Sequence, residues 1–339
     1  METSQSPRMV FITAHFIGKR LFRNYAGPFC RHDFTRAQLF ACLVLREFFG
    51  LSYRGTEQLL RDSPHWLAEI GLRVAPDHNT LWRAFTAILQ TRRVNRVLDV
   101  ITACFRRAGR LRLREKPLAL DSTCFEQRHR SLHYDRRCRQ MQLKSQAKSG
   151  AKSGAKSEEM PEKPGSWGES VNASRRRRLR TMPKLSVAVA SSCHLILAAK
   201  VRIGNGSDAP DFDNLLMRSW ERANVKTVVA DAGYDSEANH RIARQEMGVR
   251  SIIPPGIGRP TSKLPRGRWR RHMARRFAKK ADKKLYGQRS QSETVHSMIK
   301  RNQGSALRSR TPERRRQEMM LRVLTHGQSC GGAKGCEFQ

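Results

Sequence analysis

The chain has 339 residues, enough for two domains with a substantial buried core. Lys and Arg number 66 against 29 Asp and Glu, which gives a formal net charge of +37 and a pI of about 11.2. So much positive charge repels itself in a compact protein unless a polyanion neutralises it. We therefore expect a nucleic acid as partner, for an enzyme or for a plain binder. No apolar stretch reaches the 18 residues of a membrane span, which excludes a membrane protein.

Cysteine spacing and the N-terminal sequence indicate where the protein works. None of the eight cysteines forms a C-x2-C pair and no histidine pair has zinc spacing, so we expect no structural zinc site. Cys42, Cys104 and Cys193 lie in apolar stretches that are typical of buried thiols. The apolar run at 9–18 lacks the flanking residues of a signal peptide. We therefore expect a cytoplasmic, nucleoid-associated protein in a reducing compartment.

Residues 33–112 have the sequence features of a series of short helices. Thr35 and Ser52 are typical helix N-caps, and Gly50 between them is a typical stop. Near the end of the segment an apolar stripe has helical spacing: Val94, Val97, Leu98, Ile101 and Phe105. Short helices with basic ends resemble a domain that contains a helix-turn-helix, so we predict an all-helical DNA-binding domain over 1–112. A plain helical bundle is the alternative.

From Lys116 onwards the pattern changes to short apolar strands and amphipathic helices. In chain order the predicted elements are β, ββ, α, β, α, β, α, which indicates a mixed sheet with helices packed on its faces. They cover residues 117–126, 183–204, 211–223, 225–231, 235–248, 249–255 and 286–304. We predict a mixed α/β domain over 113–326, with the stretch at 286–304 as its final helix.

Two basic segments interrupt this domain. Residues 138–180 contain near-repeats of small and basic residues that bury too little apolar surface to become ordered, so we expect a disordered insert in the absence of DNA. Residues 261–284 hold 11 Lys or Arg against one acid, Asp282, with Trp269 and Phe277 interspersed. We predict that 261–284 clamp DNA phosphates, and a solvated run of charges is the alternative.

Two carboxylates are predicted at positions where a carboxylate needs a partner. Asp121 and Asp231 each follow an apolar run inside or at the end of a predicted strand, and a buried acid is costly unless it is paired or bound to metal. Glu293 on the last predicted helix would complete a three-carboxylate set. Oxygen ligands suit Mg²⁺ or Mn²⁺, and two such ions can activate a nucleophile and stabilise the leaving oxygen of a phosphodiester.

Each of these acids also has a simpler interpretation. Asp121 could form a local turn with the hydroxyls that follow it, and Asp231 could cap a loop. Glu293 could be only the i+4 partner of Arg289 on an exposed helix. The remaining acids near the motifs lie in polar surroundings or at helix starts, where capping explains them: Glu126, Asp208, Asp211, Asp213 and Asp235.

The segment 286–304 carries the most specific pattern. Tyr286, Arg289, Glu293 and Lys300 are separated by 3, 4 and 7 residues, steps that return to one face of a helix. These residues match at every position the Y-x2-R-x3-E-x6-K signature of the DDE transposases of bacterial insertion sequences. "LALDSTCFE", "VVADAGYDS" and "SLHYDRR" resemble further segments of that family. The resemblance runs from about Phe34 to His326.

The resemblance implies a ribonuclease H-like mixed-sheet catalytic core, in which Asp121, Asp231 and Glu293 are the catalytic, metal-binding triad. It also implies that Tyr286, Arg289 and Lys300 hold DNA phosphates near the cut. The expected protein binds the terminal inverted repeats of its element as a homodimer. It cuts a strand with water activated by Mg²⁺ or Mn²⁺, expected as two ions, and joins the freed 3′-hydroxyl to target DNA.

Two alternatives remain open at this point. The Gly- and Cys-rich segment 327–339 does not have the pattern of a core element, so we expect an irregular tail that departs from the family. A catalytically silent, transposase-derived DNA-binding protein would be compatible with such a tail. A ribonuclease H-like nuclease would show the same acids. His296 lies at the edge of the predicted helical face, and no role is assigned to it.

Overall fold

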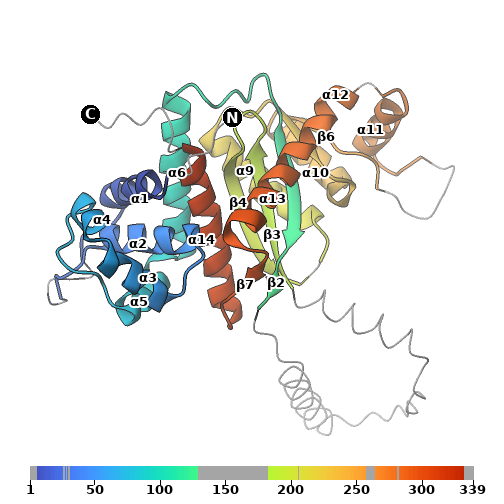
Figure 1. The fold of residues 1–339 in the computed structure, drawn as a ribbon. Coiled ribbons are helices and arrows are strands. Elements are labelled where there is room, and N and C mark those ends of the chain that lie inside the picture. Colours follow the sequence, from blue (N-terminus) through green and yellow to red (C-terminus); the bar gives the residue numbers. More distant parts are fainter. Residues whose placement is uncertain are drawn as a thin grey trace, which may run out of the picture.

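The computed structural model describes residues 6–25, 27, 29, 31–128, 182–204, 206–256, 264–280 and 282–331. The predicted disordered insert at 138–180 and the "SLHYDRR" segment lie outside these residues. The molecule has a helical part formed by the N-terminal third of the chain and a mixed sheet with helices formed by the rest (Figure 1). A continuous apolar core extends from the helical part into the sheet.

The N-terminal part consists of short helices whose starts follow from their sequence. The helices are α1 (Pro7–Leu21), α2 (Arg36–Phe48), α3 (Tyr53–Asp62), α4 (Pro64–Glu69), α5 (His78–Ile88) and α6 (Thr91–Arg107). Thr35 caps α2 through a reciprocal bond pair with Gln38, and Ser52 caps α3, as predicted. Gly50 has a φ of +65°, the left-handed conformation that ends α2. The sequence analysis did not predict α1, whose start is capped by Ser6.

The predicted mixed sheet is confirmed. Its strands are β1 (Leu118–Cys124), β3 (Pro183–Ala190), β4 (Leu195–Ile203), β5 (Thr227–Ala230) and β6 (Arg250–Ile252), in the order β4-β3-β1-β5-β6. β1 is antiparallel to β3 and parallel to β5, so it lies at the centre, where the two strand directions meet. A separate two-stranded ladder joins β2 (Glu126–Gln127) to β7 (Ala306–Leu307).

The helices of this second part pack against the sheet and its edges. They are α9 (Phe212–Arg222), α10 (Glu237–Arg241), α11 (Arg268–Ala278), α12 (Lys283–Tyr286), α13 (Ser290–Gln303) and α14 (Pro312–Gly331). A π-helical turn, Ile242–Glu246, continues α10 within the helix predicted at 235–248. In Figure 1, α13 crosses in front of the strands, and α14 lies between the sheet and the N-terminal helices.

Two predictions about the C-terminal region were wrong. The helix predicted at 286–304 is not the last, because α14 follows it and packs against β4, β3, α2 and α6. The expected irregular tail starts too early at 327, since residues 327–331 complete α14 and Cys330 is buried. The sequence did not predict α14, because many of its residues are polar. Arg322, His326 and Gln328 are nonetheless buried, because this helix passes between two parts of the protein.

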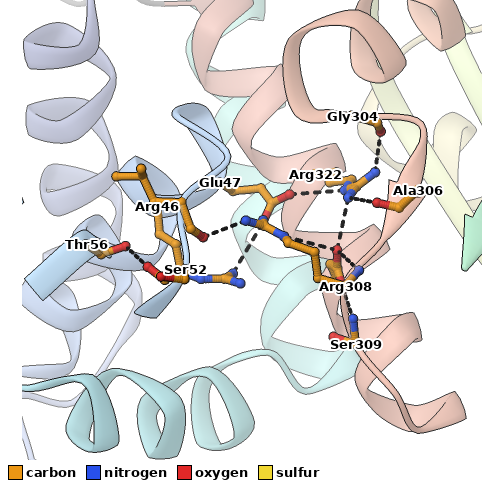
Figure 2. Close-up of polar contacts among 11 residues, drawn as sticks. Arg46, Glu47, Ser52, Thr56, Gly304, Ala306, Arg308, Ser309 and Arg322 are labelled. Atoms are coloured by element: carbon orange, nitrogen blue, oxygen red, sulfur yellow. Dashed lines mark hydrogen bonds and ion pairs between the residues drawn. The ribbon is translucent and has the colours of Figure 1, made fainter. Parts of the chain in front are cut away.

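A buried cluster of charges fixes α14 against the N-terminal helices. Glu47 of α2 and Arg322 of α14 are both almost fully buried, and their Oε1 and Nε atoms lie 3.0 Å apart (Figure 2). Arg308 reaches the other oxygen of Glu47 at 2.8 Å, and Glu318 pairs with Arg322 at 3.0 Å. Arg46 forms a further ion pair with Glu47, at 3.4 Å.

The same cluster also holds the chain between α13 and α14. Arg322 donates hydrogen bonds to the carbonyls of Gly304 and Ala306, which directly follow α13. Arg308 donates to the carbonyl of Leu51, which lies between α2 and α3. The orientation of α13 is therefore coupled to the helical part through buried charges that have hydrogen-bond partners.

We predict that Glu47→Gln lowers the free energy of unfolding by about 3–5 kcal/mol, because it leaves the three arginines of the cluster with a single carboxylate in a buried site. The measurement is the urea midpoint of the purified variant. The double variant Glu47→Gln/Arg322→Met should lose less than the sum of the two single variants, since it removes both partners of one buried pair.

Glu221→Gln is the matched control for this experiment. Glu221 has a comparable ion pair with Arg218 at 3.1 Å, but both side chains are nearly half exposed, so its loss should be small. A urea midpoint for Glu47→Gln equal to that of Glu221→Gln would show that the cluster does not hold the two parts together.

Candidate active site

The register of the sheet brings Asp121 and Asp231 together. Leu120 of β1 pairs with Ala230 of β5 in parallel, so the two residues that follow, Asp121 and Asp231, lie at the same level on neighbouring strands. Asp121 is inside β1, whereas Asp231 comes directly after β5. Burial, together with the negative charges of Asp231 and Glu293, raises the pKa of Asp121 from 3.8 to about 6. The structure therefore places the three predicted acids in one electrostatic environment.

Arg289 provides the positive charge nearest to these acids. Its Nη2 atom lies 2.5 Å from Oε1 of Glu293, and its Nη1 atom lies 3.9 Å from Oδ2 of Asp121. The guanidinium thus interacts with two of the three carboxylates at once and partly offsets the rise in the pKa of Asp121. In this state the simpler interpretation of Glu293 also holds, since it is the i+4 ion-pair partner of Arg289.

Asp231 likewise has a local partner. Its Oδ1 atom accepts a hydrogen bond from the backbone N–H of Ala232 at 2.6 Å and caps the short 3₁₀ turn Ala232–Tyr234. The simpler interpretation of Asp231 as a cap is therefore realised as well. It does not exclude a second role, because the other carboxylate oxygen makes no part of this bond.

The four signature residues lie on three consecutive elements instead of the single helix predicted over 286–304. Tyr286 ends α12, Arg289 ends a 3₁₀ turn, Gly287–Arg289, and Glu293 and Lys300 lie on α13. Tyr286 packs edge-on against Phe277 of α11, with ring centroids 5.2 Å apart, and burial raises the pKa of its hydroxyl. Lys300 donates a 2.7 Å hydrogen bond to Oγ1 of Thr123 on β1.

Most of these groups border one open cleft of about 360 Å³. Its lining includes Asp121, Thr123, Glu293 and Lys300, together with His296. Asp231, Tyr286 and Arg289 lie outside that lining. The cleft therefore combines two carboxylates and a lysine on the surface formed by β1 and α13, and the third carboxylate lies outside it, directly after β5.

His296 is the residue of the site to which the sequence analysis assigned no role. It is buried on α13, one turn after Glu293, and its Nε2 atom lies 3.9 Å from Oδ2 of Asp121. Burial, together with the charge of Lys300, lowers the pKa of the imidazole to about 4, so the ring is neutral at pH 7. Its spacing of three residues from Glu293 was the available signal, because it places both side chains on one helical face.

Three of the other acids near the motifs are satisfied by ion pairs, and not by capping as predicted. Asp208 pairs with Lys184 at 2.5 Å. Asp211 is fully buried and pairs with Lys200 at 3.0 Å and Arg202 at 2.9 Å. Asp235 is also buried and accepts two hydrogen bonds from Arg270 of α11. These carboxylates have ion-pair partners and do not line the cleft that contains Asp121 and Glu293.

The site is compatible with a divalent cation, although the acids are not arranged around one. Within the described part of the chain, no three His, Cys, Asp or Glu side chains are gathered closely enough to hold a metal ion. Carboxylate oxygens are nevertheless the ligands of Mg²⁺ and Mn²⁺, and burial, together with the negative charges of Asp231 and Glu293, raises the pKa of Asp121 to about 6. A cation near Asp121 would relieve this repulsion and release Arg289 from its contact with Asp121.

Two known protein families together match most of the chain. Residues 113–326 match a family described as "Transposase DDE domain". The chain belongs to this DDE transposase family. Residues 10–87 match a second family, described as "Transposase domain (DUF772)". Comparison with curated proteins and with solved structures gave no match.

Family membership makes this chain a transposase of a mobile element, with DNA as the substrate that the family implies and divalent metal ions as its general requirement. The mixed sheet is consistent with the ribonuclease H-like core of a DDE transposase. Across the part of this transposase that the structure describes, no helix has both the length and the apolar character needed to cross a bilayer.

We predict that Asp121→Asn stabilises the metal-free protein at about pH 7.5 but not at about pH 4. The pKa of Asp121 is about 6 in the folded protein and 3.8 ordinarily, so wild-type stability is complete below about pH 4 and is lost as pH rises through about 6. The substituted amide has no charge to bury, so the variant escapes this loss of at most about 3 kcal/mol. Thermal melting across this pH range in the presence of EDTA measures it.

Millimolar Mn²⁺ provides the second part of the same experiment. It should raise the melting temperature of the wild type at about pH 7.5 and have a much smaller effect on Asp121→Asn. Asp213→Asn is the control, because Asp213 is exposed on α9. Equal Mn²⁺ effects on the wild type and Asp121→Asn would argue against a cation at Asp121.

Proposed function

We propose that this chain is the transposase of an insertion sequence, which binds the terminal inverted repeats of its element and catalyses metal-dependent strand cleavage and strand transfer. The observation that carries the proposal is the parallel register that sets Asp121 beside Asp231, together with the charges of Asp231 and Glu293, which contribute to the raised pKa of Asp121. The Y-x2-R-x3-E-x6-K spacing and the family match support the same function.

In this proposal the three acids are the catalytic residues and would hold two Mg²⁺ or Mn²⁺ ions. When bound, such ions supply Lewis acidity at the scissile phosphate and lower the pKa of a water nucleophile. The acids fix their position, and the neutral ring of His296 lies 3.9 Å from Asp121. A neutral imidazole at this place adds no positive charge that would compete with the ions.

The residues around the acids would hold the DNA strand. Arg289 can offer its planar guanidinium to a phosphate once it leaves the carboxylates, and Lys300 presents a point charge in the cleft that Asp121 and Glu293 line. Tyr286 packs against Phe277 of α11. The positive charge of Arg289 opposes the rise that burial causes in the pKa of the Tyr286 hydroxyl. We therefore assign Tyr286 to the support of Arg289 as well as to phosphate contact.

The basic segment 261–284 would contribute to DNA binding with only some of its charges. Arg270 is engaged with Asp235, and Arg276 is engaged with Asp282 at 2.6 Å, so these two arginines hold α11 in place. Arg268 and Arg275 have no carboxylate partner among the described residues and remain available for phosphates. We propose that the N-terminal helices bind the element ends and that the protein acts on DNA as a homodimer.

The silent DNA-binding alternative loses its main support. It depended on an irregular C-terminal tail, but α14 continues to Gly331 and packs into the core. All three acids are also present, and the charges of Asp231 and Glu293 act on Asp121.

We predict that Asp121→Asn, Asp231→Asn and Glu293→Gln each reduce Mn²⁺-dependent nicking of a duplex carrying the terminal repeats by at least about a hundredfold. The reason is that each substitution removes a metal ligand and several kcal/mol of transition-state stabilisation. Gel-shift affinity for the same duplex should stay close to that of the wild type, because phosphate contacts elsewhere dominate binding.

Asp213→Asn should retain full nicking activity, since its carboxylate is exposed on α9, away from the cleft. Nicking by any of the three acid variants at the rate of Asp213→Asn would remove that acid from the triad. Preferential cutting of an RNA–DNA hybrid by the wild type would instead favour the ribonuclease H-like nuclease.

A further inference from the structure

A second pocket, of about 620 Å³, opens where the end of α6, the turn between β3 and β4 and the start of α13 meet. Its lining includes three cationic side chains, Arg110, Arg112 and Lys116, and two amide side chains, Gln288 and Gln291. The two glutamines belong to the same segment as Arg289 and Glu293. The pocket therefore adjoins, across the beginning of α13, the cleft that Asp121 and Glu293 line, which we call the acid cleft.

The charges of this pocket's cations are not neutralised by carboxylates of the described residues. None of the three takes part in an ion pair with a described carboxylate, and Glu115 is the single acid in the lining. The guanidinium of Arg110 stacks on the ring of Phe105, 5.0 Å from its centroid, which orients it without neutralising its charge. Three cations that share an open pocket with two amide groups match the chemistry of a phosphodiester backbone.

Hydrogen bonds hold the basic segment in its place. Ser191 donates to the carbonyl of Pro117 at 2.6 Å, and Ser192 accepts from the backbone N–H of Arg112 at 3.3 Å. The turn between β3 and β4 thus ties the segment that carries Arg110, Arg112 and Lys116 to the sheet. A fixed segment loses less conformational entropy when a ligand binds.

His194 completes the pocket from the same turn. It adopts a φ of +58°, and its Nε2 atom donates to Oε1 of Gln291, which links the turn to α13. The ring of His326 on α14 bonds the carbonyl of His194 at 3.0 Å. Burial lowers the pKa of His326 to about 4, so this support is neutral at pH 7. The last turns of α14, which the sequence did not predict, therefore support the base of the pocket.

We infer that this pocket binds the phosphodiester backbone of the DNA strand that leaves the acid cleft. Pro117 directly follows Lys116, the last cation of the pocket. From Pro117 to Asp121 is four residues of extended chain, or about 13 Å at ~3.3 Å per residue. That span corresponds to about four nucleotides at ~3.4 Å per step, so the contacted phosphates lie roughly four nucleotides from the cut. The inference rests on the proposed function, because it takes DNA as the substrate of the acid cleft.

The test compares two triple variants with equal charge. The pocket variant is Arg110→Gln/Arg112→Gln/Lys116→Gln. The control is Arg106→Gln/Arg107→Gln/Arg114→Gln, whose side chains are exposed on the same segment but lie outside the pocket lining. Binding of a fluorescein-labelled duplex is measured by anisotropy over a range of NaCl concentrations, with thermal melting as the check on folding.

The pocket variant should reduce the slope of log K against log salt by about 2–3, since each lost phosphate contact lowers it by about 0.9 for duplex or 0.7 for single-stranded DNA. The control variant should change the slope by less than half as much. Equal slopes in the two variants, both folded, would overturn the inference. So would tight binding of pyrophosphate by the wild type with an unchanged DNA slope in the pocket variant, because the pocket would then serve a small free anion.

Neutral methylphosphonate linkages locate the contact along the DNA. Linkages placed about four nucleotides from the cut should weaken binding by the wild type several-fold and have no further effect on the pocket variant. Additive losses would mean that the pocket and those phosphates do not meet, and would overturn the inference. A wild-type protein that never cuts DNA, yet shows this pattern of binding, would contradict the proposed function and leave the pocket in place.

Discussion

A carboxylate at the centre of the sheet requires positive charge, and much of the active-site arrangement follows from that requirement. Asp121 is mostly buried and has Asp231 and Glu293 as negative neighbours, so its pKa rises to about 6. Arg289 meets part of this need by lying near Asp121 and against Glu293. A divalent cation would meet it more completely. Under the proposed function, Arg289 lies near the acids that would hold the metal, and binding of the metal would make its guanidinium available to the DNA.

The position of α13 determines whether these charges can act together, and buried polar contacts fix that position at both ends. At its C-terminal end, Arg322 holds the carbonyls that follow the helix and pairs with Glu47 of the N-terminal part. Near its N-terminal end, Gln291 bonds His194 on the turn between β3 and β4. DNA bound to the N-terminal helices would thus be coupled mechanically to Glu293 and Lys300.

The sequence predicted the elements whose signals are local. Alternating or continuous apolar runs identified the strands, and side-chain caps such as Thr35 and Ser52 identified helix starts. The spacing of Tyr286, Arg289, Glu293 and Lys300 identified one side of the site. It could not predict α14, because the burial of Arg322 and His326 depends on partners that lie far away in the chain. Nor could it predict the pocket beside α13, whose residues come from three separate segments.

The central claim is that a divalent cation takes over the position near Asp121 and Asp231 and releases Arg289 to the DNA. Anomalous diffraction from a crystal of the protein with Mn²⁺ and a duplex of the element end tests it most directly. The account predicts a Mn²⁺ peak within coordination distance of both carboxylates, with the guanidinium of Arg289 on a DNA phosphate. The absence of a peak there at saturating Mn²⁺, with Arg289 still bound to Glu293, would contradict the account.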